Sequence, residues 1–272
     1  MKRNRIKTIL CLWWIGLLGG AALGADLPEL DGLIEPYMVV KVGSGVAGIL
    51  EAVTVDRGDF VQKGQVLAEL DSGVERATLE LARARAEMEE TISLKKARLD
   101  FVAREEERRD RLYRQGALPY YDRDEARTNK IMAQCELQDA IEKKRLAALE
   151  VIQAEEALKR RKIRSPIHGV VKERFLSPGE RVEDQPIMEL AQMDPLNVEV
   201  IAPVKYLGFI RVGMKALVFP EEPVGGKYVG RVTIVDRVID AASGTFGIRV
   251  ELPNPGNRIP AGLKCRVRFL RR

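Results

Sequence analysis

A run of 91 residues, from Ser72 to Lys162, is the feature that most limits how this chain of 272 residues can fold. It contains 40 Asp, Glu, Lys and Arg residues, and its glycines and prolines are only Gly73, Gly116 and Pro119. A run so charged and so poor in helix breakers is typical of long, solvent-exposed helices. Gly116 can cap a helix C-terminus and Pro119 cannot lie inside a helix, so the run is expected to divide there.

We therefore expect one helix over about 73–115 and a second over about 122–162, each on the order of 60 Å long. Ser72 is the predicted N-cap of the first helix and Asp122 that of the second, because each is followed three residues later by a glutamate. A short loop between two helices of similar length favours an antiparallel hairpin.

Apolar residues at heptad-compatible spacing give each predicted helix a narrow seam. In the first helix they are Val74, Leu81, Met88 and, after a skip, Ile92 and Leu99; in the second they are Leu137, Ile141, Ala148, Val151 and Leu158. A seam this narrow is unsuited to a globular core and predicts a two-helix coiled coil.

The sequences on the two sides of this run are related to each other. VDRGDFVQKGQVLAELD, residues 55–71, overlays the sequence 121 positions later, and the same shift places Gly169 on Gly48 and Gly179 on Gly58. Glycines recur at turns that need a positive φ or that leave no room for a side chain. The repeat predicts one flattened β-sandwich whose two halves are separated by the helices.

The strand-forming segments outside the helical run suggest two β domains. Residues 39–71 and 163–192 are expected to pair into the sandwich, and residues 196–272 alternate apolar and polar side chains at period two between Gly, Pro and Asn turns. Five or six such strands predict a small antiparallel barrel, and residues 31–42 supply a further strand. The fold class is thus α+β and mostly β.

The N-terminus carries an export sequence. Four basic residues in the first seven positions precede an apolar run, residues 8–25, that ends in small side chains. This pattern predicts a signal peptide over residues 1–25 that is cleaved near Gly24–Ala25. The alternative is a retained membrane anchor.

Composition argues against several classes of function. The formal net charge is a modest +5 and no basic patch is interleaved with aromatic residues, so nucleic acid is not an expected partner. The single histidine, His168, and the scattered Cys135 and Cys265 form no metal-binding spacing. No catalytic residue, cofactor or metal site is predicted.

Each half of the sandwich resembles a half of a lipoyl or biotinyl carrier domain. Such carriers hold a modifiable lysine on the turn between the halves, but no Met-Lys-Met or Asp-Lys-Ala sequence occurs here, and Lys63 lies at an internal turn. The helical hairpin stands where the carrier turn would be. A carrier lysine is therefore not expected.

A split lipoyl-like sandwich, an inserted α-helical hairpin and a C-terminal β-barrel resemble the periplasmic adaptor family, the HlyD-like membrane fusion proteins. The motifs that carry the resemblance are VDRGDFVQKGQVLAELD, RSPIHGVV with SPGERV, and ASGTFGIRVELPNPGNRIPAGL. The last is similar to the barrel ending of adaptors of resistance-nodulation-division (RND) pumps, although Gly244 stands where an arginine is usual. The family's membrane-proximal domain is expected to be missing.

The resemblance implies a protein of the periplasm, associated with the inner membrane, that links an inner-membrane transporter to an outer-membrane duct. It also implies a homo-oligomeric ring, a trimer or a hexamer. An RND transporter is the first expectation, and an ABC or MFS exporter is the alternative. A carrier module and an envelope coiled-coil protein without a transport role are the other readings.

The resemblance also implies a contact site at the hairpin tip. RND-type adaptors have an arginine there, a leucine four residues later and a serine seven residues beyond that. The spacing falls on Arg108, Leu112 and Pro119, so the serine is absent, and Asp124 also fits the tip. Partner binding by these residues is expected by analogy; ordinary hairpin surface is the alternative.

Overall fold

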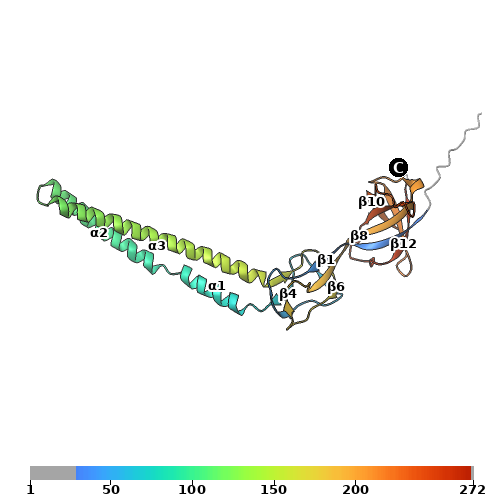
Figure 1. The fold of residues 1–272 in the computed structure, drawn as a ribbon, viewed down its shortest axis with the longest axis horizontal. Coiled ribbons are helices and arrows are strands. Elements are labelled where there is room, and N and C mark those ends of the chain that lie inside the picture. The colour runs from blue at the N-terminus through green and yellow to red at the C-terminus, as the bar shows by residue number, and fades with distance from the viewer. Residues whose placement is uncertain (1–28, 271–272) are drawn as a thin grey trace, which may run out of the picture. The chain divides into compact units, whose positions relative to one another are not determined.

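The computed structural model describes residues 29–270, and the predicted signal sequence lies outside them. The chain forms two compact units (Figure 1). One consists of Ile34–Asn197 with Pro253–Gly262 and holds the sandwich and the helices. The other includes Val198–Leu252, and it forms the barrel together with residues 30–33 at the start of the first strand and with the C-terminal strand.

The sandwich is built from short strands around one apolar core. Its strands are β2 (Gly48–Val53), β3 (Phe60–Val61), β4 (Val66–Leu70), β5 (Lys162–Arg164), β6 (Gly169–Arg174) and β7 (Arg181–Val182), with parts of β1 (Leu30–Val42) and β8 (Met188–Pro203). Core side chains come from both halves of the sequence repeat, for example Leu67 and Leu70 from the first half and Val182 and Leu190 from the second. Neither half can bury its apolar face without the other.

The strand bounds reproduce the predicted repeat. A shift of 121 residues carries β2 onto β6 and β3 onto β7 without a change of bounds. The halves are interlocked, because β2 pairs with β7 at Gly48↔Val182 and β3 pairs with β6 at Val61↔Gly169. The same shift relates these two pairings to each other, so the sandwich has an approximate internal two-fold symmetry.

The glycines of the repeat occupy positions where a side chain would be unfavourable, for the two reasons that the sequence suggested. Gly58 and Gly179 have φ values of +94° and +91°, a region that L-residues with a side chain rarely adopt. Gly169 is needed for a different reason, because a Cβ atom there would lie 2.2 Å from the carbonyl oxygen of Ala191.

The helical run forms three helices rather than the two that were predicted. They are α1 (Gly73–Ala86), α2 (Glu90–Arg114) and α3 (Tyr120–Arg160), and α3 runs antiparallel to the other two (Figure 1). The predicted first helix is interrupted between Ala86 and Glu90, where the apolar series skips from Met88 to Ile92. A four-residue step there moves the apolar seam around the helix, and the chain breaks the helix at this point.

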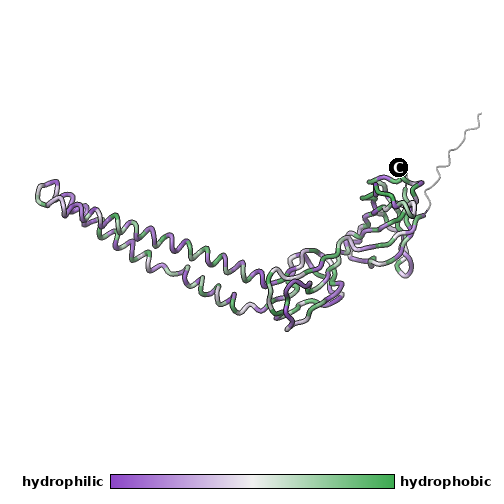
Figure 2. The backbone as a smooth tube through the Cα atoms, in the orientation of Figure 1, coloured by the Kyte–Doolittle hydropathy of each residue, from purple (hydrophilic) through white to green (hydrophobic). Residues whose placement is uncertain are grey.

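The seam of the hairpin is centred on alanines that the sequence analysis missed. Ala126, Ala133, Ala140 and Ala154 are buried at heptad spacing on α3. Their small side chains let the facing helix approach closely, so larger residues are displaced to the flanks. Apolar and polar residues alternate along both arms of the hairpin (Figure 2).

The predicted seam was correct only in part. Five of its residues are half-buried: Ile92, Leu99, Leu137, Val151 and Leu158. The remaining five, Val74, Leu81, Met88, Ile141 and Ala148, are exposed, and α1 packs through Leu79 and Ala82 instead. The prediction selected large apolar residues, whereas the closely packed interface selects small ones.

The barrel has six strands in the order β1-β12-β9-β10-β11-β8, and an additional β1–β8 pairing closes it. Its further strands are β9 (Lys215–Pro220), β10 (Tyr228–Val235), β11 (Thr245–Leu252) and β12 (Lys264–Phe269). Alternate side chains such as Phe246, Ile248 and Val250 on β11 are buried, as the period-two pattern predicted.

One predicted boundary of the barrel was wrong. Residues 253–262, assigned above to the barrel, belong to the same compact unit as the sandwich. Buried Asn254 explains this, because its backbone N–H donates to the Asp194 carboxylate at 2.9 Å and its side-chain amide donates to the Met193 carbonyl oxygen at 2.8 Å. Gly262 also donates its N–H to the Ile34 carbonyl oxygen at 2.7 Å.

Within residues 29–270, no helix combines the length and the apolar character that a membrane span requires.

The two described cysteines should react very differently with thiol reagents. Burial raises the pKa of the Cys265 thiol to about 12, with Asp31 and Glu221 adding to the shift, whereas Cys135 is exposed on α3. With Cys11 replaced by serine, a disulfide reagent at neutral pH should titrate one thiol in the folded protein and two in guanidinium chloride. A Cys135→Ser variant should titrate none while folded, and rapid reaction in that variant would contradict the buried position of Cys265.

Candidate functional site: the hairpin tip and base

The tip is a tight turn that ends α2 in a defined way. Gly116 has a φ of +73°, and its N–H donates to the Tyr113 carbonyl oxygen at 3.0 Å. The N–H of Ala117 donates to the Leu112 carbonyl oxygen, also at 3.0 Å. These two bonds form a Schellman motif, so the predicted capping role of Gly116 is confirmed.

The start of α3 differs from the prediction. The helix begins at Tyr120 with Pro119 at the N-cap position, and no side chain caps it. Asp122 lies within the first turn, where its negative charge is favourable beside the free backbone N–H groups. The restricted backbone of Pro119 sets the start three residues earlier than a side-chain cap at Asp122 would.

Near the tip the seam changes from apolar to polar and aromatic. The Arg123 guanidinium donates to the Asp110 carboxylate at 2.9 Å and lies 4.8 Å from the centroid of the Tyr113 ring. The Tyr113 and Tyr120 rings meet edge to face with their centroids 6.2 Å apart. These contacts join α2 to α3 and fix the geometry of the turn, although single exposed ion pairs contribute little stability.

Further along the hairpin, carboxylates are held by lysines from the opposite arm. A hydrogen bond from Lys95 lowers the pKa of Glu136, and Arg98 adds to the effect. A hydrogen bond from Lys144 likewise lowers the pKa of Glu89. Both carboxylates therefore stay ionised at neutral pH, and the charged pairs between the arms persist there.

The four residues predicted for partner contact all lie near the tip but do not form one cluster. Arg108 and Leu112 lie one turn apart on α2, with the Arg108 side chain 60% exposed beside Glu105 and Leu112 38% exposed. Pro119 lies in the turn, and Asp124 is exposed on α3. In the described hairpin no hydrogen bond or ion pair joins any two of the four.

Two aromatic side chains at the tip were missed by the sequence analysis. Tyr120 and Tyr121 are 62% and 75% exposed. Tyrosine is over-represented among the residues that dominate protein interfaces. The signal was present in the letters LPYYD, since two aromatic residues directly after a helix-starting proline cannot both face the narrow seam.

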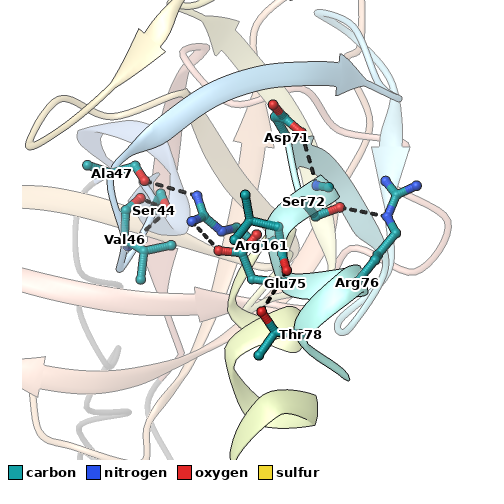
Figure 3. A network of polar contacts seen from close by, with 11 residues as sticks. Ser44, Val46, Ala47, Asp71, Ser72, Glu75, Arg76, Thr78 and Arg161 are labelled. Carbon is teal, nitrogen blue, oxygen red and sulfur yellow. Dashed lines mark hydrogen bonds and ion pairs between the residues drawn. The ribbon is translucent and has the colours of Figure 1, made fainter. Parts of the chain in front are cut away.

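The base of the hairpin is held to the sandwich by a polar network (Figure 3). Arg161, directly after α3, donates to the Glu75 carboxylate on α1 at 2.5 Å and to the Ala47 carbonyl oxygen at 3.1 Å. Arg76 donates to the Ser72 hydroxyl at 3.0 Å and to the Glu51 carboxylate on β2 at 3.3 Å. The two ends of the helical insertion are thus tied to each other and to β2.

The predicted capping box at Ser72 is not formed. The first helix does start at Gly73, but the N–H of Gly73 donates to the Asp71 carboxylate at 3.1 Å, and the Ser72 side chain caps nothing. Glu75 does not reach back to Ser72 because it pairs with Arg161. Ser72 and Glu75, which were predicted to cap the helix, therefore help to anchor the hairpin instead.

The pair of Arg161 and Glu75 lies in a confined place. Their side chains are 22% and 16% exposed, and Oε2 of Glu75 is buried without a hydrogen bond, the one such side-chain atom among the described residues. Gly48 leaves room for the guanidinium, since a Cβ atom there would lie 2.7 Å from Arg161 Nη1. The negative charge of the Glu75 carboxylate is thus compensated by the Arg161 guanidinium.

The comparison with known proteins decides the family. Residues 38–192, more than half of the chain, match the model of the CzcB-like barrel-sandwich hybrid domain. The chain belongs to the CzcB-like family of membrane fusion proteins. Members of this family are structural linkers and not enzymes.

Relatives and solved structures agree with this family. The chain is 29% identical over 77% of its length to the cobalt-zinc-cadmium resistance protein CzcB of Cupriavidus metallidurans, of which it covers 38%. It is 28% identical over 88% of its length to the membrane fusion protein MtrC of Neisseria gonorrhoeae, of which it covers 58%. The chain thus spans less than two thirds of the curated relatives it matches.

The fold is shared with MacA from Actinobacillus actinomycetemcomitans. The TM-score is 0.74 at 22% identity, and the likeness covers 89% of this chain and 78% of that one.

In residues 29–270, no three His, Cys, Asp or Glu side chains gather in a way that could hold a metal ion.

Removal of the arginine at the base should destabilise the hairpin. Arg161→Ala leaves the Glu75 carboxylate buried without a partner, and we expect a loss of about 2 kcal/mol in the free energy of unfolding. Hydrogen exchange should accelerate at the start of α1 and the end of α3. Arg160→Ala, an exposed neighbour, is the matched control.

A double variant tests whether the pair itself is responsible. Replacing both Glu75 and Arg161 with leucine removes the unpaired charge, so it should recover much of the lost stability. Equal behaviour of Arg161→Ala and Arg160→Ala would show that the pair does not anchor the hairpin.

Proposed function

We propose that this chain is the periplasmic adaptor subunit of a tripartite efflux system, and that it links an inner-membrane transporter of RND type to an outer-membrane duct. The observation that carries the proposal is the hairpin. It replaces the lysine-bearing turn of a carrier domain, and its α3 arm of 41 residues is about 60 Å long. A rigid arm of this length is suited to bridging and has no use in presenting a carrier lysine.

The tip has the properties of a docking surface. Leu112, Tyr120 and Tyr121 expose apolar area around a turn that is fixed by the Schellman motif and by the Arg123 contacts. A preformed turn loses little conformational entropy when it binds a partner. The exposed Arg108 and Asp124 add charge to the edge of this surface.

The sides of the hairpin support assembly of several copies. Val74 and Leu81, seven residues apart on α1, form a short exposed apolar stripe, and Leu81 lines an open groove of about 350 Å³ between α1 and α3. Copies that associate head to tail around a closed ring, a trimer or a hexamer, would cover such stripes. Several weak tip contacts would then act together through multivalency.

Photocrosslinking in intact cells tests the linking role. A photoreactive residue at Leu112 or Tyr121 should capture an outer-membrane protein, and one at Ile201 on the barrel should capture an inner-membrane transporter. Leu94, which is 69% exposed on α2, is the matched control away from the tip and should capture no duct. Absence of both products, with the protein expressed and folded, would exclude the adaptor role.

Variants of the tip should weaken efflux without unfolding the chain. Tyr121→Ala and Leu112→Asp each remove exposed apolar area from the tip, and we expect about tenfold weaker duct binding for each. Thermal unfolding of both variants should match that of the original protein, because neither side chain lies in the seam. Unchanged duct binding by the Leu112→Asp/Tyr121→Ala double variant would place the contact elsewhere.

A further inference from the structure

Two loops lie together at one end of the barrel. Loop 204–214 joins β8 to β9, and loop 236–244 joins β10 to β11. The N–H of Val204 donates to the Gly244 carbonyl oxygen at 2.9 Å, so the start of the first loop lies against the end of the second. We call this region the loop end of the barrel.

Both ends of the described chain lie at the loop end as well. The N–H of Leu270 donates to the carbonyl oxygen of Lys215, which directly follows loop 204–214, at 2.9 Å. Leu30 pairs with Val267 on the last strand, and Glu29 makes an ion pair with Arg268 at 2.5 Å. The start of the first described strand and the end of the last one therefore both lie at the loop end.

The loops expose apolar side chains that nothing in the barrel covers. Leu207, Phe209 and Val212 on the first loop are 42%, 55% and 64% exposed, and Val238 on the second is 84% exposed. Ile210 between them is buried and attaches the first loop to the barrel. The exposed side chains are thus displayed on a structured loop.

Basic side chains accompany this apolar set. Loop 204–214 contains Lys205 and Arg211 and no acidic residue. Arg211 Nε donates to the Gly208 carbonyl oxygen at 3.2 Å, which ties the guanidinium to the backbone of the loop. An apolar surface flanked by basic residues is the pattern of proteins that lie on anionic membranes.

The two acidic residues of the second loop keep their charge, and Arg237 in the same loop offsets one of them. Asp240 accepts the N–H of Ala242 and the hydroxyl of Ser243, and these bonds lower its pKa. The carboxylate of Asp236 lies over Gly247 on β11, where a Cβ atom would be 2.3 Å from it. The two loops together carry three basic residues against two acidic ones, so a small net positive charge lies beside the exposed apolar side chains, and it is concentrated on the first loop.

The N-terminal apolar run lies only a few residues before the loop end in the sequence. The apolar run of residues 8–25 ends four residues before Glu29, and four extended residues reach at most about 14 Å. Where this run remains attached to the chain as an anchor, it would hold the loop end close to a bilayer.

We propose that the loop end of the barrel binds the surface of a bilayer that contains anionic phospholipid. Phe209, Leu207, Val212 and Val238 enter the interfacial layer, and Lys205 and Arg211 contact the phosphate groups. The proposal does not rest on the adaptor role, because vesicles without any transporter or duct suffice to test it.

A fluorescent reporter on the full-length chain tests membrane contact. An environment-sensitive dye is attached at Phe209→Cys, with Cys11 and Cys135 replaced by serine. In vesicles of phosphatidylcholine and phosphatidylglycerol, spin-labelled lipid should quench it. The matched control carries the dye at Lys227→Cys, on the turn between β9 and β10 at the other end of the barrel, and should be quenched only by aqueous iodide. Equal lipid quenching at both positions, or none at Phe209, would overturn the proposal.

Charge reversal tests the role of the basic residues. Lys205→Glu and Arg211→Glu should each lower the fraction of reporter in contact with lipid about fivefold or more at low salt, and phosphatidylcholine alone should give little quenching. Lys227→Glu should have no effect. Insensitivity to both reversals would contradict the recognition of anionic lipid.

Crosslinking in cells identifies the occupant of this surface. Benzoylphenylalanine at Phe209 has nearly the shape of the original side chain and should give a phospholipid adduct, detected as a mass increase of the loop peptide. A second copy of the chain or a transporter polypeptide as the main product would overturn the proposal and assign the surface to that partner instead.

Discussion

The pairing of the two half-sandwiches is the constraint on which the rest of the helical unit depends. Because β2 pairs with β7 and β3 with β6, the sandwich closes only when segments on both sides of the 91-residue run come together. The ends of the run are then adjacent, and the helices between them must return to their starting point. An antiparallel hairpin is the direct consequence of this closure.

Closure by itself does not set the direction in which the hairpin leaves the sandwich. That is set at the base, where Arg161 joins the end of α3 to Glu75 on α1 and to Ala47 before β2. Gly48, one of the glycines of the sequence repeat, is needed at this point because it leaves room for that guanidinium. The same residue therefore belongs both to the repeated sandwich sequence and to the base of the hairpin. An arm of about 60 Å multiplies small angular changes at its base into large displacements at its tip, so this pair affects the reach of the tip more than its modest share of stability suggests.

Much of this architecture could be predicted from the sequence, because glycines and prolines impose backbone conformations that do not depend on distant contacts. Gly58 and Gly179 revealed the repeat, and Gly116 and Pro119 revealed the tip. The details of packing could not be predicted in the same way. Alanine is the best helix former, so an alanine at each seam position is not distinguished from alanines that merely favour helix. The exposure of Leu81 follows from that alanine seam, because α1 packs against it through Leu79 and Ala82 instead.

The tip residues show a further limit of sequence reasoning. Arg108 and Leu112 were placed there by family spacing, and their exposure on α2 agrees with that placement without testing their role. The Gly and Pro pattern around Tyr120 and Tyr121 indicates where the helices end and does not by itself predict that these two side chains are exposed. A tight turn confines the seam to Tyr113 and one facing aromatic residue, so a second tyrosine beside it must face outward. Adjacent aromatic residues at the start of a narrow coiled coil therefore predict an exposed aromatic surface, and that prediction needs only the turn and the residues that follow it.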